Sequence, residues 1–180
     1  MITTNELAKR LAIPTSNIRA LEALGVITGT PVTIGKTRAW PEETVEELAD
    51  RQFIEDLPHP RAIAVKVQPA ESITPIPGDP RTHKGWIAGL PNNYTKRQID
   101  GVNRYWAVKD APDWIDEVFL VTSKTFILAP YRITGVKQHG NDWSFALTEP
   151  DTETRKLFDQ KRIHSRRGPF VERLPDTRNQ

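Results

Sequence analysis

The chain has 180 residues, of which 37% are hydrophobic, 27% are charged and none is cysteine. This length allows one large domain or two small ones, and the lack of cysteine excludes disulfides, thiolate catalysis and cysteine-bound zinc. No apolar run reaches the roughly 18 residues of a membrane-spanning helix, and the first residues lack the layout of a signal peptide, so we expect a cytoplasmic protein with no membrane partner.

Charged residues are unevenly distributed along the chain, although the net charge is only +2. Residues 1–38 contain five basic and two acidic residues, whereas residues 39–57 contain one basic and seven acidic residues. Residues 155–167 contain six basic residues and one acidic residue. The sequence therefore predicts two cationic surfaces, one near each end of the chain.

Two short helices joined by a tight turn are predicted at the start of the chain. Thr3 or Thr4 can cap a helix that runs to Leu11. Pro14 interrupts the helical pattern, and a second helix with apolar residues at helical spacing follows and ends at Gly25.

A hairpin and a third helix are predicted next. Residues 28–40 are rich in Thr, Val and Gly, and Gly35 lies at the expected turn. Pro41 suits the first turn of a helix, and the acidic residues after it complement the helix dipole. The predicted apolar side of this third helix consists of Val45, Leu48, Ala49, Phe53 and Ile54.

Helix, turn, helix, hairpin and helix is the order of elements in a winged helix-turn-helix. In that arrangement the second helix enters the DNA major groove with its amino-terminal residues nearest the bases. Ser16, Asn17 and Arg19 occupy that end here, and their hydroxyl, amide and guanidinium groups suit phosphates and base edges. A helical hairpin with a solvated polar side is the alternative interpretation.

The stretches "ELAKRLAIPTSNIRALEALGVI" and "TRAWPEETVEELADRQFI" resemble the DNA-binding domain of the MerR family and related excisionase-type winged helices. The resemblance covers residues 1–57 and implies double-stranded DNA as the partner. Because no long heptad helix follows, it does not imply the usual MerR dimer, and a monomer on an asymmetric site is compatible with it. The implied DNA contacts lie on the second helix, on the wing and near the turn: Ser16, Asn17, Arg19, Lys36, Thr37, Arg38 and Arg10.

Residues 58–180 are predicted to form a second, α+β domain that is mostly β and barrel-like. Strand-like runs occur at 62–67, 104–108, 117–121, 125–136 and 142–147, and helices are predicted at 95–103 and 152–163. In the last helix Leu157 and Phe158 are expected to point inward. The expected aromatic core is Trp106, Phe119, Phe126, Tyr131, Trp143 and Phe145.

The stretches "RYWAV" and "ILAPYRITGV" resemble strands of the PUA, EVE and ASCH barrels, which often hold a base or nucleotide. Residues 81–104 contain five basic residues and one acidic residue, interleaved with aromatics, which is typical of contact with phosphates and sugars. The basic segment near the chain end points the same way. The additional predicted DNA contacts are Arg97, Arg162, Arg166 and Arg167.

An enzymatic alternative depends on carboxylates that could bind Mg²⁺ in a nuclease. The candidates are Asp110, Asp113, Asp116 and Glu117, with Lys124 nearby. The four histidines lack metal-ligand spacing, and there is no P-loop, G-x-G-x-x-G or G-x-S-x-G motif, so we expect no cofactor and no catalytic residues.

Together these patterns predict a sequence-specific DNA-binding protein, either a transcriptional repressor or regulator or an architectural factor in recombination. We expect its origin to be a phage or a mobile element. A restriction-type nuclease or a reader of modified bases is the alternative.

Overall fold

The computed structural model describes residues 1–55, 60–165 and 169–175. The chain divides into two compact units, Met1–Gln52 (unit 1) and Phe53–Gln180 (unit 2). Each unit contains both helices and strands, which confirms the predicted α+β class. The division falls a few residues before the predicted boundary at residues 57 and 58, which lie outside the described residues.

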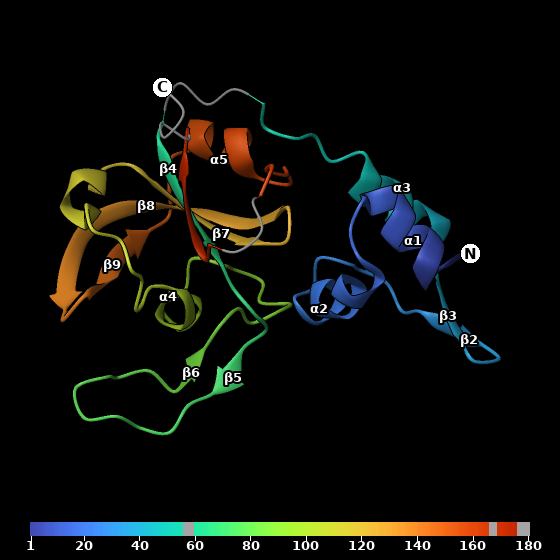
Figure 1. Cartoon of the computed structure of the whole chain (residues 1–180), viewed down its shortest axis with the longest axis horizontal. Helices are drawn as coiled ribbons and strands as arrows, with labels where there is room; N and C mark the ends of the chain where they lie inside the picture. Colours follow the sequence, from blue (N-terminus) through green and yellow to red (C-terminus); the bar gives the residue numbers. More distant parts are fainter. Residues whose placement is uncertain (56–59, 166–168, 176–180) are drawn as a thin grey trace. The chain divides into compact units, whose positions relative to one another are not determined.

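Unit 1 contains three α-helices, a 3-10 turn and a small antiparallel sheet with the strand order β1-β3-β2 (Figure 1). The β2–β3 hairpin turns at Gly35, as predicted, with a positive φ of 64°. Its elements in chain order are β1 (Ile2–Thr3), α1 (Thr4–Leu11), η1 (Thr15–Asn17), α2 (Ile18–Ala23), β2 (Val32–Ile34), β3 (Thr37–Trp40) and α3 (Glu42–Ala49).

Local sequence signals set the ends of the first two helices. The backbone N–H of Glu6 donates to Oγ1 of Thr3 at 3.3 Å, and the backbone N–H of Thr3 donates to Oε2 of Glu6 at 2.9 Å, which completes a capping box. After α2, Gly25 has a φ of 71°, a conformation that glycine adopts with little strain. The buried side chains between the helices and the sheet are Leu7, Leu11, Ile18, Leu21, Leu24, Trp40, Val45 and Leu48.

Helix α3 ends at Ala49, so the prediction that Phe53 and Ile54 continue its apolar side is wrong. The backbone N–H of Ile54 donates to the carbonyl of Arg162 at 2.9 Å, and the Ile54 side chain packs against the core of unit 2. A segment more than a hundred residues away thus supplies the backbone partner that a longer helix would otherwise have supplied.

Unit 2 is built on a five-stranded sheet with the order β10-β4-β7-β8-β9 (Figure 1). Strands β4 and β7 are parallel, and the other neighbours are antiparallel. Strands β5 and β6 form a separate antiparallel pair. The elements are β4 (Ala62–Lys66), β5 (Glu71–Ser72), β6 (His83–Lys84), α4 (Lys96–Val102), η2 (Ala111–Trp114), β7 (Val118–Ser123), β8 (Phe126–His139), β9 (Asp142–Thr148), α5 (Thr152–Phe158) and β10 (Val171–Leu174).

The predicted barrel is wrong for the described residues, because the edge strands β10 and β9 do not pair with each other and the sheet stays open. Register shifts at Val121/Thr122 and at Ile133/Gly135 interrupt the pairing of β8 with its two neighbours, and such bulges bend strands locally without closing a sheet. The predicted strand at 104–108 is also wrong, since Trp106 forms only an isolated bridge with Trp143.

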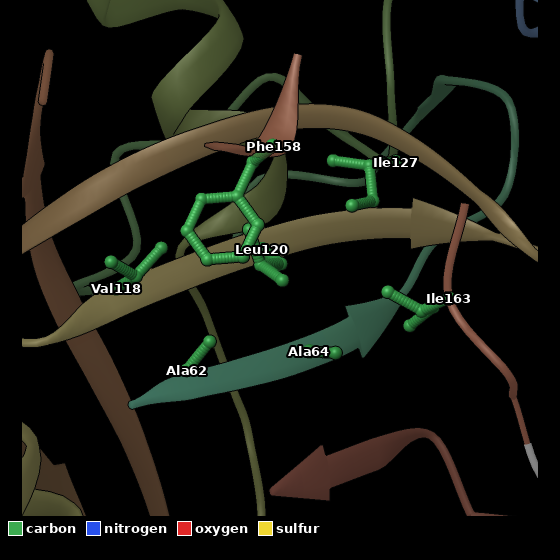
Figure 2. Packing of buried hydrophobic residues seen from close by; sticks show 7 residues of the cluster. All are labelled: Ala62, Ala64, Val118, Leu120, Ile127, Phe158 and Ile163. Atoms are coloured by element: carbon green, nitrogen blue, oxygen red, sulfur yellow. The ribbon is translucent and has the colours of Figure 1, made fainter. Parts of the chain in front are cut away.

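One face of the sheet is covered by α5 and the segment that follows it. Figure 2 shows the aromatic ring of Phe158 among apolar side chains of β4, β7 and β8. Phe158 is completely buried, but the neighbouring Leu157 is 50% exposed, which corrects the prediction that both point inward. Adjacent residues of a helix point in different directions, and this short helix buries only one of the two.

Four of the six predicted core aromatics are buried. They are Phe119, Phe126, Tyr131 and Phe145, whereas Trp106 and Trp143 are half-buried. The prediction of an aromatic core is therefore correct for the four rings within the sheet. It is wrong for the two indole rings, which lie toward the margin of the sheet.

We predict that Phe158→Ala lowers the free energy of unfolding by about 3–5 kcal/mol, because it leaves a cavity in a fully buried cluster. The matched control Leu157→Ala, one residue earlier in the same helix, should change stability by no more than about 0.5 kcal/mol. Urea denaturation of both variants measures the difference. Equal losses would contradict the assignment of Phe158, and not Leu157, to the core.

Candidate nucleic-acid interface

A hollow of about 510 Å³ lies in unit 1 between the start of α2 and the β2–β3 hairpin. The 3-10 turn η1 contributes Ser16, and α2 contributes Arg19 and Glu22. The hairpin contributes Lys36, Thr37, Arg38 and Trp40. Five of the seven residues of unit 1 that the sequence predicts to contact DNA therefore border one concave surface. The helix and the hairpin reach it because the apolar sides of both pack on the shared core described above.

Arg19 and Lys36 are the exposed cations of this hollow. Among the described residues, neither makes an ion pair with a carboxylate. Ser16 and Thr37 are exposed polar neighbours that can donate or accept a hydrogen bond. The hollow thus presents unpaired positive charge beside short hydroxyl groups, which suits an anionic partner.

Arg38 also lines the hollow, but it is paired. Its Nη1 donates to Oε2 of Glu22 at 3.0 Å and its Nη2 donates to Oε1 at 2.6 Å, a bidentate ion pair. The guanidinium carbon lies 5.3 Å from the ring centroid of Trp40. Arg38 therefore connects the hairpin to α2. Glu22 follows Arg19 by three residues, so its place on the same side of the helix was readable from the sequence, but its partner was not.

Two other predicted contacts in unit 1 lie elsewhere. Asn17 is half-buried and does not line the hollow. Arg10 of α1 is also absent from the lining, and its Nη2 lies 3.4 Å from Oε1 of Glu42 on α3. Position in the sequence alone did not distinguish Asn17 and Arg10 from Ser16 and Arg19.

In unit 2 the predicted contact Arg162 is wrong, because its residue is only 4% exposed. Its guanidinium carbon lies 4.4 Å from the ring centroid of Phe53 and 4.6 Å from that of Phe126. Both Nε and Nη2 donate to Oγ1 of Thr125, at 3.1 and 2.9 Å. This side chain holds the first residues of unit 2 against β8 and cannot reach a phosphate from there.

Three other basic residues of unit 2 are predicted to contact DNA, and the structure describes one of them. Arg97 is exposed on α4 and stays a predicted DNA contact. Arg166 and Arg167 lie outside the described residues.

Three of the four carboxylates considered for a nuclease, those of Asp110, Asp116 and Glu117, are bound to separate arginines. Arg173 pairs with Asp110 and lowers its pKa through a side-chain hydrogen bond. Arg132 Nη2 lies 2.7 Å from Oδ1 of Asp116, and Arg61 Nε lies 2.9 Å from Oε1 of Glu117. No three His, Asp or Glu side chains in the part of the chain that the structure describes form a group able to hold a metal ion.

No protein-family model, curated protein or solved structure matches this chain. Among the described residues, no helix is both long enough and apolar enough to cross a membrane.

The pair between Glu22 and Arg38 can be measured with a double-mutant cycle. We predict that Glu22→Gln, Arg38→Gln and their combination give a coupling energy of about 0.2–1 kcal/mol, because both groups are partly exposed to water. The corresponding cycle on Arg10 and Glu42, a single and more exposed contact, should give a smaller value. Thermal unfolding of the variants measures both, and zero coupling for Glu22 and Arg38 would remove the proposed connection.

Proposed function

We propose that unit 1 binds double-stranded DNA as a winged helix-turn-helix. The start of α2 would enter the major groove, and the β2–β3 hairpin would contact the phosphate backbone as the wing. One observation carries the proposal: Ser16 of η1 and Arg19 of α2 border the same hollow as Lys36 and Thr37 from the hairpin. The unpaired charges of Arg19 and Lys36 support an anionic partner.

The chemistry of these groups suggests different tasks. A guanidinium forms two hydrogen bonds to guanine in the major groove, so Arg19 is the candidate for base recognition. A lysine ammonium neutralises phosphate without reading sequence, so Lys36 is the candidate for a backbone contact. The ion pair between Glu22 and Arg38 holds the wing and α2 together before DNA binds, which would lower the entropic cost of binding.

A protein that binds duplex DNA in this way would serve as a transcriptional repressor or as an architectural factor in recombination. Arg97 on α4 is a candidate for an additional contact from unit 2. The binding sequence can be found by selecting bound duplexes from a random pool with the full chain. Enrichment of one motif is expected if α2 reads bases.

Arg19→Ala should weaken binding to the selected duplex by about 1–3 kcal/mol and relax specificity at one position, since it removes a base contact. Fluorescence anisotropy with the full chain measures the affinity. Arg10→Ala is the matched control: it removes the same charge from unit 1 outside the hollow and should have a smaller effect. If the two variants bind equally well, Arg19 has no special role.

Lys36→Gln should weaken binding to all duplexes alike and reduce the slope of log affinity against log salt concentration by about 0.9, because one phosphate contact is lost. Lys9→Gln provides the control, since Lys9 is an exposed lysine of α1 that does not line the hollow. Anisotropy titrations at several salt concentrations give the slopes. An unchanged slope for Lys36→Gln would argue against a wing contact with phosphate.

A further inference from the structure

Unit 2 contains a second hollow, of about 380 Å³, whose lining combines cationic groups with exposed aromatic rings. This volume falls within the roughly 300–1,000 Å³ that is usual for small-molecule sites. It lies beside β5, β6 and the end of α4, elements that neighbour one another in Figure 1. The residues that carry the argument are Arg81, Arg104, Tyr105 and Phe170.

Positive charge in this hollow exceeds the negative charge by one. Lys66 pairs with Glu172 and Lys84 pairs with Glu71, so the excess comes from the two arginines. The carboxylate of Asp79, whose side chain is 1% exposed, lies 2.7 Å from Nη2 of Arg81 and 3.7 Å from Nη1 of Arg104. Hydrogen bonds from Arg81 lower the pKa of Asp79 to about 2, so that it is ionised at neutral pH. One carboxylate between two guanidinium groups leaves a net charge of +1.

The hydrogen bonding of Arg104 is incomplete. Its 3.7 Å separation from Asp79 exceeds the length of a hydrogen bond, and among the described residues its buried Nε has no partner. The side chain is nevertheless 18% exposed, so part of the guanidinium can be reached from the hollow. Since a partly buried guanidinium with incomplete hydrogen bonding costs free energy, an anion that reaches the exposed part of Arg104 would be favourable.

Aromatic rings supply a flat apolar border beside this charge. The guanidinium carbon of Arg81 lies 4.9 Å from the ring centroid of Tyr105, and the ring of His139 meets Tyr105 edge-on at 5.0 Å. These contacts hold Tyr105 in place. Phe170 is 65% exposed. Its backbone is nevertheless fixed, because the carbonyl of Phe170 accepts a hydrogen bond from the N–H of Lys66 at 2.8 Å. Both rings can stack with a planar ligand.

A close contact between backbone segments fixes part of this hollow before any ligand binds. The N–H of Gly85 donates to the carbonyl of Gly101 at 2.8 Å, which holds α4 against the segment after β6. A Cβ on Gly101 would collide with the carbonyl of Gly85 and with the ring of His83. Glycine is therefore needed at Gly101 for this approach, and a ligand would not have to order this part of the lining.

We propose that this hollow binds a small anion with a planar aromatic part, in which a phosphate or carboxylate group is attached to the ring directly or through a sugar. The anionic group would lie at Arg104, and the ring would lie against Tyr105 and Phe170. A nucleoside monophosphate and an aromatic carboxylate share this chemistry. The proposal concerns unit 2 and does not depend on DNA binding by unit 1.

Isothermal titration of the full chain with four probes tests the ligand class. AMP and salicylate represent the two sources, and adenosine and inorganic phosphate represent the ring and the anion alone. We expect AMP or salicylate to bind with one-to-one stoichiometry, at least about tenfold tighter than adenosine and phosphate, because one added contact to a charged group is worth that factor. If only one of these two compounds binds, it shows whether the site takes the nucleotide phosphate or the aromatic carboxylate. If neither AMP nor salicylate binds, or if adenosine binds as tightly as AMP, the proposal is overturned.

Variants of the full chain then locate the site. Arg104→Gln and Phe170→Ala should each weaken the ligand at least about tenfold, and Phe170→Ala should leave the melting temperature unchanged because the ring is exposed. Arg97→Gln and Leu157→Ala are matched controls, as exposed side chains of unit 2 outside the hollow. Arg19→Ala should leave ligand affinity unchanged, which separates this site from the one proposed in unit 1. Full affinity in Phe170→Ala, or equal losses in the controls, would overturn the assignment.

Discussion

Both units depend on contacts made by arginine side chains that a carboxylate or aromatic rings hold in place. Arg38 joins the hairpin to α2 through Glu22, and Arg162 joins the start of unit 2 to β8 through two aromatic rings and Thr125. A guanidinium combines a flat face with several fixed donors, so it can satisfy such mixed environments where lysine cannot. Much of the positive charge of the chain therefore stabilises its own fold.

These contacts separate cations that support the structure from cations that remain open to a partner. In unit 1, among the described residues, Arg19 and Lys36 are not paired with an acid, and they face the same hollow as Ser16. In unit 2, Arg104 is only partly compensated, and it lies beside exposed rings. The two proposals differ in physical basis. Arg19 and Lys36 are exposed to water and would bind phosphates with release of counterions, whereas the guanidinium of Arg104 is partly buried and gains from an anionic partner.

Short-range patterns in the sequence predicted much of the local structure. Thr3 or Thr4 was the predicted cap of the first helix, and Thr3 is the observed one. Gly25 predicted the end of α2, and Gly35 predicted the hairpin that carries Lys36. These predictions succeeded because capping, helical spacing and positive φ depend on residues only a few positions apart. The concave arrangement of the candidate interface followed from the order of these elements.

The sequence by itself determined the α+β class, most helix and strand positions and the residue types available for binding. Only the tertiary structure decided that Ile54 belongs to unit 2, that Leu157 is exposed, that the sheet stays open, and that Arg162 is buried while Arg19 is not. The physical reason is that burial and ion pairing depend on partners distant in the chain, such as residue 162 beside residue 54. Charge counts along the sequence carry no information about such partners.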